Sequence, residues 1–65
     1  MQREYYESDV DFYSMFESDT FDVEEMTDNV FKGYVFNDAG ERVLAATLTL
    51  DATGGGWGEW DDTVI

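Results

Sequence analysis

The sequence predicts an α+β fold, a single mini-domain spanning residues 1–65 in which short acidic helical segments precede an antiparallel β-hairpin or a three-stranded sheet. Three observations lead to this prediction. Apolar residues recur at helical spacing in the first half of the chain, whereas two runs in the second half alternate like strands. With 65 residues and 43% hydrophobic composition, the chain can build one core and has no room for a second domain.

The first helix is expected from Asp9 to Glu17. Ser8 provides an N-cap, and acidic residues in the first turn suit the positive end of the helix dipole. Phe12 and Phe16 lie four residues apart, so they would share one face of the helix. The same segment also alternates apolar and polar residues, which leaves a strand as the alternative. The polar residues 1–7 are expected to form a frayed end.

A second, shorter helix is expected over residues 23–28, after a polar turn. Asp22 provides the N-cap and Glu25 follows three residues later, as in a capping box. Phe21 and Met26 are spaced for the hydrophobic staple that spans such a cap. Both helices would then carry an exposed acidic face.

The β-hairpin is the strongest structural prediction. It joins Val30–Phe36 to Val43–Leu50 through a loop in which Gly40 suits a left-handed backbone position. Residues 63–65 are expected to add a third strand. The core-facing side of the second strand would be made by Leu44, Ala46, Leu48 and Leu50.

The glycine-rich segment Asp51–Gly58 predicts a hinge or a mobile tip. Asp51 to Asp62 also has the length of a calcium loop, with glycine at its sixth position, but Thr53 and Gly55 occupy positions where oxygen ligands are needed. We therefore favour the hinge, with a divalent-cation site as a distant alternative. No Lys follows the glycines, and the acids around them would repel a phosphate. No metal or other cofactor is predicted.

The net charge of −13 indicates the kind of partner. Sixteen acids against three bases would repel nucleic acids and anionic lipids, so we expect no direct binding to nucleic acid or to a membrane. No apolar stretch approaches the length of a membrane span, and the N-terminus lacks the features of a signal peptide. A cytoplasmic protein with a basic protein partner is expected.

The absence of His and Cys excludes several classes of function. Disulfides, a catalytic triad and a thiolate nucleophile all require residues that the chain lacks. A carboxylate-based glycosidase would need a cleft that so short a chain can hardly enclose, so an enzyme is not expected. A domain of this size often relies on oligomerisation, so a homodimer remains a possible state of the protein.

Ten of the acids lie between Glu4 and Asp28, where no Lys or Arg interrupts them. Three interpretations are open: a solvated face, adaptation to high salt, and mimicry of nucleic acid by ordered carboxylates. Under mimicry the partner-binding residues are Glu7, Asp9, Asp11, Glu17, Asp19, Asp22, Glu24, Glu25 and Asp28, with Asp61 and Asp62 as a second patch and Tyr5, Tyr6 and Trp60 as apolar anchors.

This composition resembles that of the small acidic DNA-mimic inhibitors encoded by phages and mobile elements. The resemblance lies in small size, strong acidity, lack of Cys and richness in aromatics, and it involves no diagnostic motif. It implies inhibition of a restriction, CRISPR, DNA-repair or nucleoid protein in the host cytoplasm. The alternative is a salt-adapted or accessory protein-protein interaction domain that binds through its hairpin and exposed aromatics.

Overall fold

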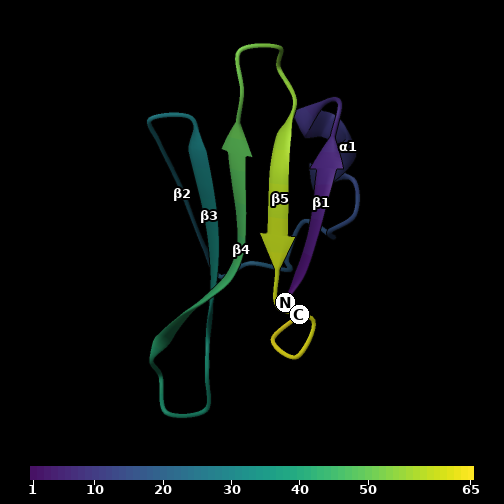
Figure 1. Ribbon diagram of the computed structural model, residues 1–65. Helices are drawn as coiled ribbons and strands as arrows, with labels where there is room; N and C mark the ends of the chain where they lie inside the picture. Colours follow the sequence, from purple (N-terminus) through teal and green to yellow (C-terminus); the bar gives the residue numbers. More distant parts are fainter.

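Five antiparallel strands form one sheet in the order β1-β5-β4-β3-β2 (Figure 1). The computed structural model describes all residues from 1 to 65. Its elements are β1 (Gln2–Tyr6), α1 (Asp9–Tyr13), β2 (Val23–Thr27), β3 (Val30–Phe36), β4 (Arg42–Leu50) and β5 (Gly56–Trp60). The α+β prediction is therefore wrong: the fold is mostly β, with one short helix.

The N-terminal residues are not a frayed end. Residues 2–6 form β1, which pairs along its whole length with β5. Side chains alternate between the two faces of a strand. Tyr6 is accordingly buried on one face of the sheet, whereas Tyr5 is exposed on the other.

Helix α1 begins as predicted but ends early. The side chain of Ser8 accepts a hydrogen bond from the backbone N–H of Val10, which confirms the N-cap. The helix ends at Tyr13 instead of Glu17, and the backbone N–H of Phe16 then bonds to the carbonyl of Tyr13, three residues back. This tighter turn leads Phe16 into contact with Phe21, with ring centroids 5.1 Å apart.

The second predicted helix is a strand, β2. It is joined to β3 by a two-residue turn, Asp28 and Asn29, whose φ values of 51° and 65° fit a type I′ hairpin. Asp22 does not cap a helix: its carboxylate accepts a hydrogen bond from the backbone N–H of Phe36 at 2.9 Å. Pairing with β3 supplies backbone partners along the whole segment, and this prevails over the local capping pattern.

The β3–β4 hairpin is confirmed, including the left-handed Gly40 with φ 78°. Its register shifts beside Gly33, which pairs with Ala46 while the next residue, Tyr34, pairs with Leu44. Ala45 is therefore the extra residue of a β-bulge. Because the bulge reverses the alternation, Leu44 leaves the core-facing side and is 41% exposed, contrary to prediction.

The glycine-rich hinge is confirmed only over residues 51–55, which form the turn before β5 with Gly54 at φ 91°. It is wrong beyond them, because residues 56–60 form β5 between β1 and β4. Residues 63–65 form no strand. The glycines leave room for neighbouring groups: a Cβ on Gly58 would lie 2.6 Å from the Phe12 ring. Glycine in this strand thus allows an aromatic ring to lie directly on the backbone.

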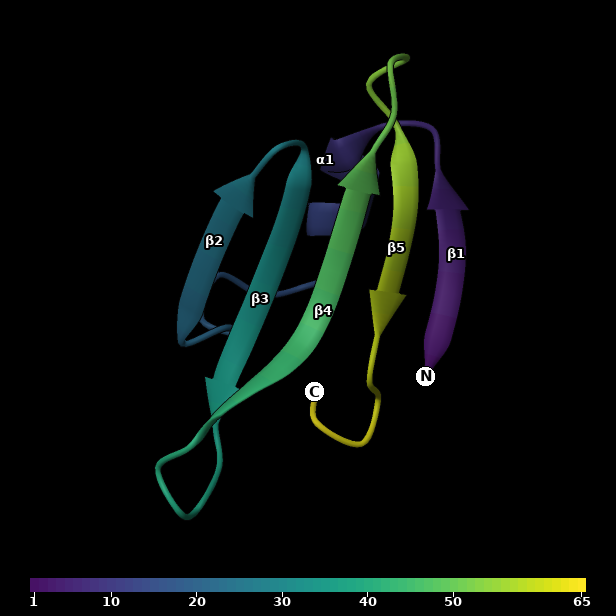
Figure 2. The same cartoon turned by 60° about the vertical axis from the view of Figure 1, so that its left-hand side comes forward.

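The hydrophobic core lies between α1 and one face of the sheet (Figure 2). Its buried members are Tyr6, Phe12, Phe31, Ala46 and Leu48. Phe12 is fully buried and makes edge-on contacts with several aromatic rings, including those of Tyr6 and Phe31. The chain contains no helix of the length and apolarity needed to cross a membrane. The opposite face of the sheet has no element covering it, and we call it the open face (Figure 1).

Candidate functional site

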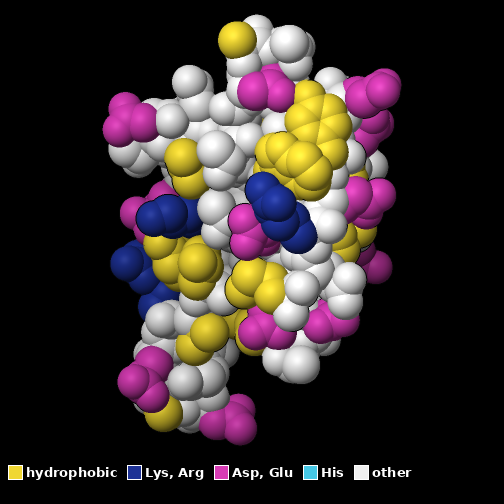
Figure 3. Space-filling model, in the orientation of Figure 1, with side chains coloured by type: hydrophobic (Ala, Val, Ile, Leu, Met, Phe, Trp, Pro, Cys, Tyr) yellow, Lys and Arg dark blue, Asp and Glu magenta, His cyan; other side chains and the backbone are white.

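The strand register assigns each charged residue to one face of the sheet. Directly paired residues of antiparallel strands share a face. One row across all five strands on the open face consists of Arg3, Glu59, Thr47, Lys32 and Glu25. A second row on the same face consists of Tyr5, Trp57, Thr49, Val30 and Thr27. The apolar and basic side chains of this face are visible in Figure 3.

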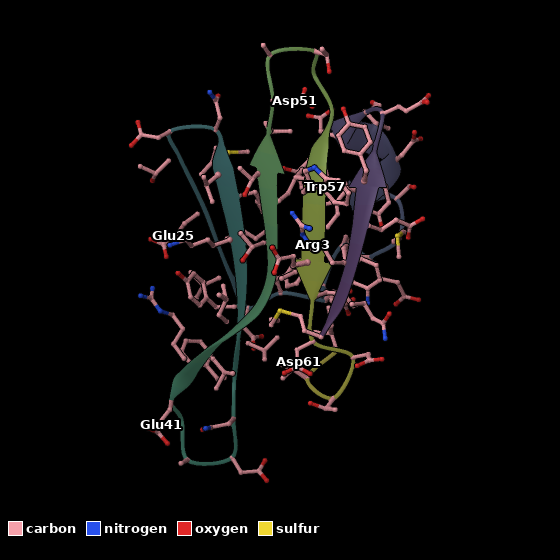
Figure 4. The ribbon with its side chains drawn as sticks, in the orientation of Figure 1. Arg3, Glu25, Glu41, Asp51, Trp57 and Asp61 are labelled. Atoms are coloured by element: carbon pink, nitrogen blue, oxygen red, sulfur yellow. The ribbon has the colours of Figure 1, made fainter.

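Arg3 lies across β5 on the open face (Figure 4). Its Nε lies 3.6 Å from Glu59 Oε1, and its guanidinium lies 4.2 Å from the centroid of the Trp57 ring. Tyr5 contacts the same indole edge-on, with centroids 5.3 Å apart. Exposed ion pairs of this kind stabilise a fold only slightly. We therefore regard the cluster as a possible contact surface and not as a source of stability.

Arg42 makes a similar arrangement at the other side of the open face. It lies 3.5 Å from Glu25 Oε1, and its guanidinium is 4.4 Å from the centroid of the Tyr34 ring. Lys32, the third base, makes no ion pair. All three bases of the chain therefore lie on the open face.

The helix-bearing side of the molecule carries acids and no base. Glu4 and Glu24 belong to the strand residues on the covered face, since they pair with Gly58 and Gly33. Further acids lie on α1 and in the segment that follows it, on the same side of the sheet (Figure 2). We call this set the acidic face: Glu4, Asp9, Asp11, Glu17, Asp19 and Glu24.

Tyr13 lies among three members of the acidic face. A shallow hollow is lined by Tyr13, Phe16 and Phe21 together with Glu17 and Glu24. Burial raises the pKa of the Tyr13 hydroxyl, and the charges of Asp9 and Glu24 raise it further. Carboxylates that are 15 residues apart in sequence therefore act on one hydroxyl, and the hydroxyl stays protonated as a hydrogen-bond donor.

Two of the proposed aromatic anchors lie wholly or partly in the core. Tyr6 is buried, and burial raises the pKa of its hydroxyl, followed by the charge of Glu4. Trp60 is half-buried against the core cluster. Tyr5 and Trp57, which are 41% and 44% exposed, lie on the open face, and Phe36 near the β3–β4 tip is 53% exposed. Of these three, only Tyr5 was among the predicted anchors.

Asp51 and Asp61 have structural roles at the two ends of β5. Each carboxylate accepts hydrogen bonds from the backbone N–H and the hydroxyl of the Thr two residues later, Thr53 and Thr63. The Thr53 hydroxyl, and then that of Tyr5 at 2.6 Å, lower the pKa of Asp51 to about 2. The bonds from Thr63 lower the pKa of Asp61. These carboxylates are fixed by local turns.

No three of the acids come close enough together to hold a metal ion. The calcium-loop alternative is wrong, because Asp51 and Asp62 lie beyond opposite ends of β5. Asp62 accepts a hydrogen bond from the amide of Gln2 at 3.2 Å. The carboxylates are spread over the surface, too far apart for three of them to share one ion.

The structure divides the predicted partner-binding residues into groups. Those that it brings together on the acidic face are Asp9, Asp11, Glu17, Asp19 and Glu24. Glu7 acts on the hydroxyl of Tyr5, and Asp22 is bound to the backbone of Phe36. Glu25 lies on the opposite face, Asp28 lies in the β2–β3 turn, and Asp61 and Asp62 follow β5. Glu4 was not among the predicted residues, because residues 1–7 were not expected to form a strand, and Tyr13 was not predicted either.

Comparisons with known proteins give no relative for this chain. No family model matches it, and searches of curated proteins and of solved structures yield no match.

Proposed function

We propose that the protein is a DNA-mimic inhibitor. Its acidic face binds the basic nucleic-acid-binding surface of a restriction, CRISPR, DNA-repair or nucleoid protein and competes there with DNA. One observation carries the proposal: the acidic face contains six carboxylates and no base, whereas Arg3, Lys32 and Arg42 all lie on the open face. A basic partner would therefore meet negative charge without local neutralisation.

The charge density of the molecule supports this function. Its longest extent is 39 Å and its net charge is −13, which gives one net charge per about 3 Å of length. One strand of duplex DNA carries one charge per about 3.4 Å. Along its length the molecule as a whole thus carries negative charge at a density close to that of one DNA strand.

The order of the carboxylates supports it as well. The acids of α1 are held by the Ser8 cap and by Phe12, which is fully buried between the helix and the sheet. Glu24 is held by the β2–β3 ladder. A surface arranged before binding loses little conformational entropy on association, and charge attraction steers the encounter. An acidic disordered tail would lack this advantage.

The test measures displacement of a fluorescent DNA duplex from purified representatives of the four target classes, at several salt concentrations. For at least one class we expect inhibition that weakens steeply as ionic strength rises. The double variant Glu17→Lys and Glu24→Lys should raise the inhibition constant at least about tenfold. The matched control is Asp38→Lys with Glu41→Lys at the β3–β4 tip, which changes net charge equally and should leave inhibition within about threefold.

Equal losses in the two double variants would mean that net charge alone matters and would refute the assignment to the acidic face. The alternative function, an accessory interaction domain, is favoured by the exposure of Tyr5 and Trp57. It requires that Trp57→Ala abolish partner binding while the Glu17 and Glu24 changes leave it intact. Absence of inhibition in all four classes would refute the proposed function.

A further inference from the structure

The central row of the open face is complementary to its own reversal. In the sheet order β1-β5-β4-β3-β2, its residues Arg3, Glu59, Thr47, Lys32 and Glu25 are positive, negative, neutral, positive and negative. Read from the other edge, the order is negative, positive, neutral, negative and positive. Every charge meets its opposite when the row is laid on its own reversal, and Thr47 meets Thr47.

From this pattern we propose that a second copy of the chain binds the open face and forms a symmetric two-sheet dimer. A two-fold axis that runs parallel to the strands through Thr47 places β4 on β4, and β5 on the partner's β3. Lys32 then faces Glu59 of the second copy, and Arg3 faces Glu25. Lys32 makes no ion pair within its own chain, so the dimer would give it a carboxylate.

The second row of the open face fits the same axis by size. Its order is Tyr5, Trp57, Thr49, Val30 and Thr27. Reversal places the two large rings over Val30 and Thr27 of the other copy, and Thr49 over Thr49. Large side chains thus face small ones, which is the condition for two sheet faces to interdigitate.

A two-fold axis that crosses the strands through the central row fits the charges of that row poorly. It would place each strand on its own copy, so that Lys32 would face Lys32 and Glu59 would face Glu59. Like charges held opposite one another oppose association. The row therefore selects the parallel axis.

The twist of packed sheets identifies the pairs that matter most. Aligned sheets cross at about 30°. The offset between two residues that face each other across the dimer therefore grows with their distance from the axis. The Lys32–Glu59 pairs lie one strand spacing from the axis, about 4.8 Å, and shift by only about 2.4 Å. The outer Arg3–Glu25 pairs shift by about 5 Å. The inner pairs should therefore determine the register.

A second copy suits this face better than a strongly charged foreign partner does. The central row has equal numbers of acids and bases, within a molecule of net charge −13. Association here brings together the parts of two acidic chains that repel each other least. Both acidic faces would point outward from the dimer, and the inference does not rest on the proposed function.

Sedimentation equilibrium over micromolar to millimolar concentrations gives the first test. At 0.01 M salt the Debye length of about 30 Å leaves the repulsion between copies unscreened, whereas it is about 8 Å at 0.15 M. We therefore expect monomer at the lower salt concentration and reversible dimer at the higher one. A chain that stays monomeric to millimolar concentration at 0.15 M overturns the proposal.

Charge reversal gives a sharper test, because two variants should fail separately and succeed together. Lys32→Glu places a carboxylate opposite Glu59 of the second copy, and Glu59→Lys places an ammonium group opposite Lys32, so each alone should weaken self-association at least about tenfold. An equimolar mixture restores both pairs and should dimerise within about threefold of wild type. Glu24→Lys, on the acidic face, changes the net charge as Glu59→Lys does and should leave the dimer intact. Circular dichroism checks that each variant is folded.

Wild-type self-association in both single variants would overturn the assignment to the open face, and a mixture that stays monomeric would overturn the register. Crosslinking keeps the register testable if Glu59→Lys does not fold. The chain has no Cys, so Thr47→Cys presents one thiol at the axis, about 10 Å from its copy. A short bismaleimide should link it, whereas Thr27→Cys, about 19 Å or more from its copy, should not react. Equal crosslinking of the two overturns the axis.

Discussion

Glu24 and Glu25 are neighbours in β2 and lie on opposite faces of the sheet. Glu24 pairs in the ladder with Gly33, over which the Phe21 ring lies on the covered face. Glu25 is the strand-register partner of Lys32 on the open face, and its carboxylate lies 3.5 Å from the Arg42 guanidinium. Two identical carboxylates, one residue apart, thus belong to different candidate surfaces.

This relationship predicts different results for the same substitution at adjacent positions. Glu24→Lys should weaken binding to a basic target and reduce the salt slope of log affinity by about one, because one carboxylate leaves the acidic face. Glu25→Lys should leave that slope unchanged and lower the free energy of unfolding by no more than about 1 kcal/mol, because it removes an exposed ion pair. Fluorescence titrations across a salt series measure the slopes. Equal effects would contradict the division into two faces.

Gly58→Ala should destabilise the fold by about 1–3 kcal/mol. A Cβ at this position would lie 2.6 Å from the Phe12 ring, which is fully buried and has nowhere to move. Urea unfolding measures the change, with Thr49→Ala on the open face of the adjacent strand as a control expected within about 0.5 kcal/mol. In a Phe12→Leu background the cost of Gly58→Ala should shrink, because the smaller side chain relieves the contact. An undiminished cost would mean that the backbone, and not the ring, requires glycine.

The contact between Gly58 and Phe12 also explains why the sequence did not predict β5. Successive glycines are poor strand formers when judged locally, so the segment was interpreted as a hinge. The Phe12 ring of α1 covers Gly58, and backbone atoms of Tyr6 and Thr49 lie against Gly55 and Gly56, so the segment becomes a packed strand. Phe12 and Tyr6 lie more than 40 residues away from Gly58 in the sequence, where no local pattern can reveal them.

The first half of the chain shows the opposite error. Asp22 and Glu25 have capping-box spacing, yet the segment is a strand whose end is marked by Asp28 and Asn29 in a type I′ turn. The Ser8 cap and the β3–β4 hairpin were predicted correctly because their signals are local. The assignment of acids to faces depends on register and could not be obtained from the sequence.

Asn29 offers a direct test of that turn. Its φ of 65° is left-handed, a conformation that costs most residues about 1–2 kcal/mol and that glycine adopts freely. Asn29→Ala should therefore lower the free energy of unfolding by about 1 kcal/mol, whereas Asn29→Gly should preserve or raise it. Chemical denaturation of wild type and the two variants ranks their free energies of unfolding. If residue 29 lay in a helix, the alanine variant would be more stable than the glycine variant, since alanine favours helices and glycine does not.

Asp51 should make the stability of the fold depend on pH in the acid range. Its pKa is about 2 in the folded protein, held down by hydrogen bonds from Thr53 and Tyr5, and 3.8 is its ordinary value. A lowered folded pKa gives stability that is present above about pH 4 and is lost as pH falls toward 2. The stability gap between wild type and Asp51→Ala should therefore be constant above pH 4 and narrow below it. Urea unfolding from pH 2 to 7 tests this, with Asp38→Ala correcting for the loss of one charge.

Salt and charge reversal should show that the acidic face opposes stability. At 0.01 M salt the repulsion within a chain of net charge −13 is scarcely screened, so added sodium chloride should raise the free energy of unfolding. Glu24→Lys should raise it by about 0.5 kcal/mol at low salt and by less at high salt, in thermal or urea unfolding. If Glu24 made interactions that stabilise the folded state, Glu24→Lys would instead lower the free energy of unfolding. A substitution that stabilises the chain but weakens target binding would mean that these carboxylates are kept for binding, at a cost to folding.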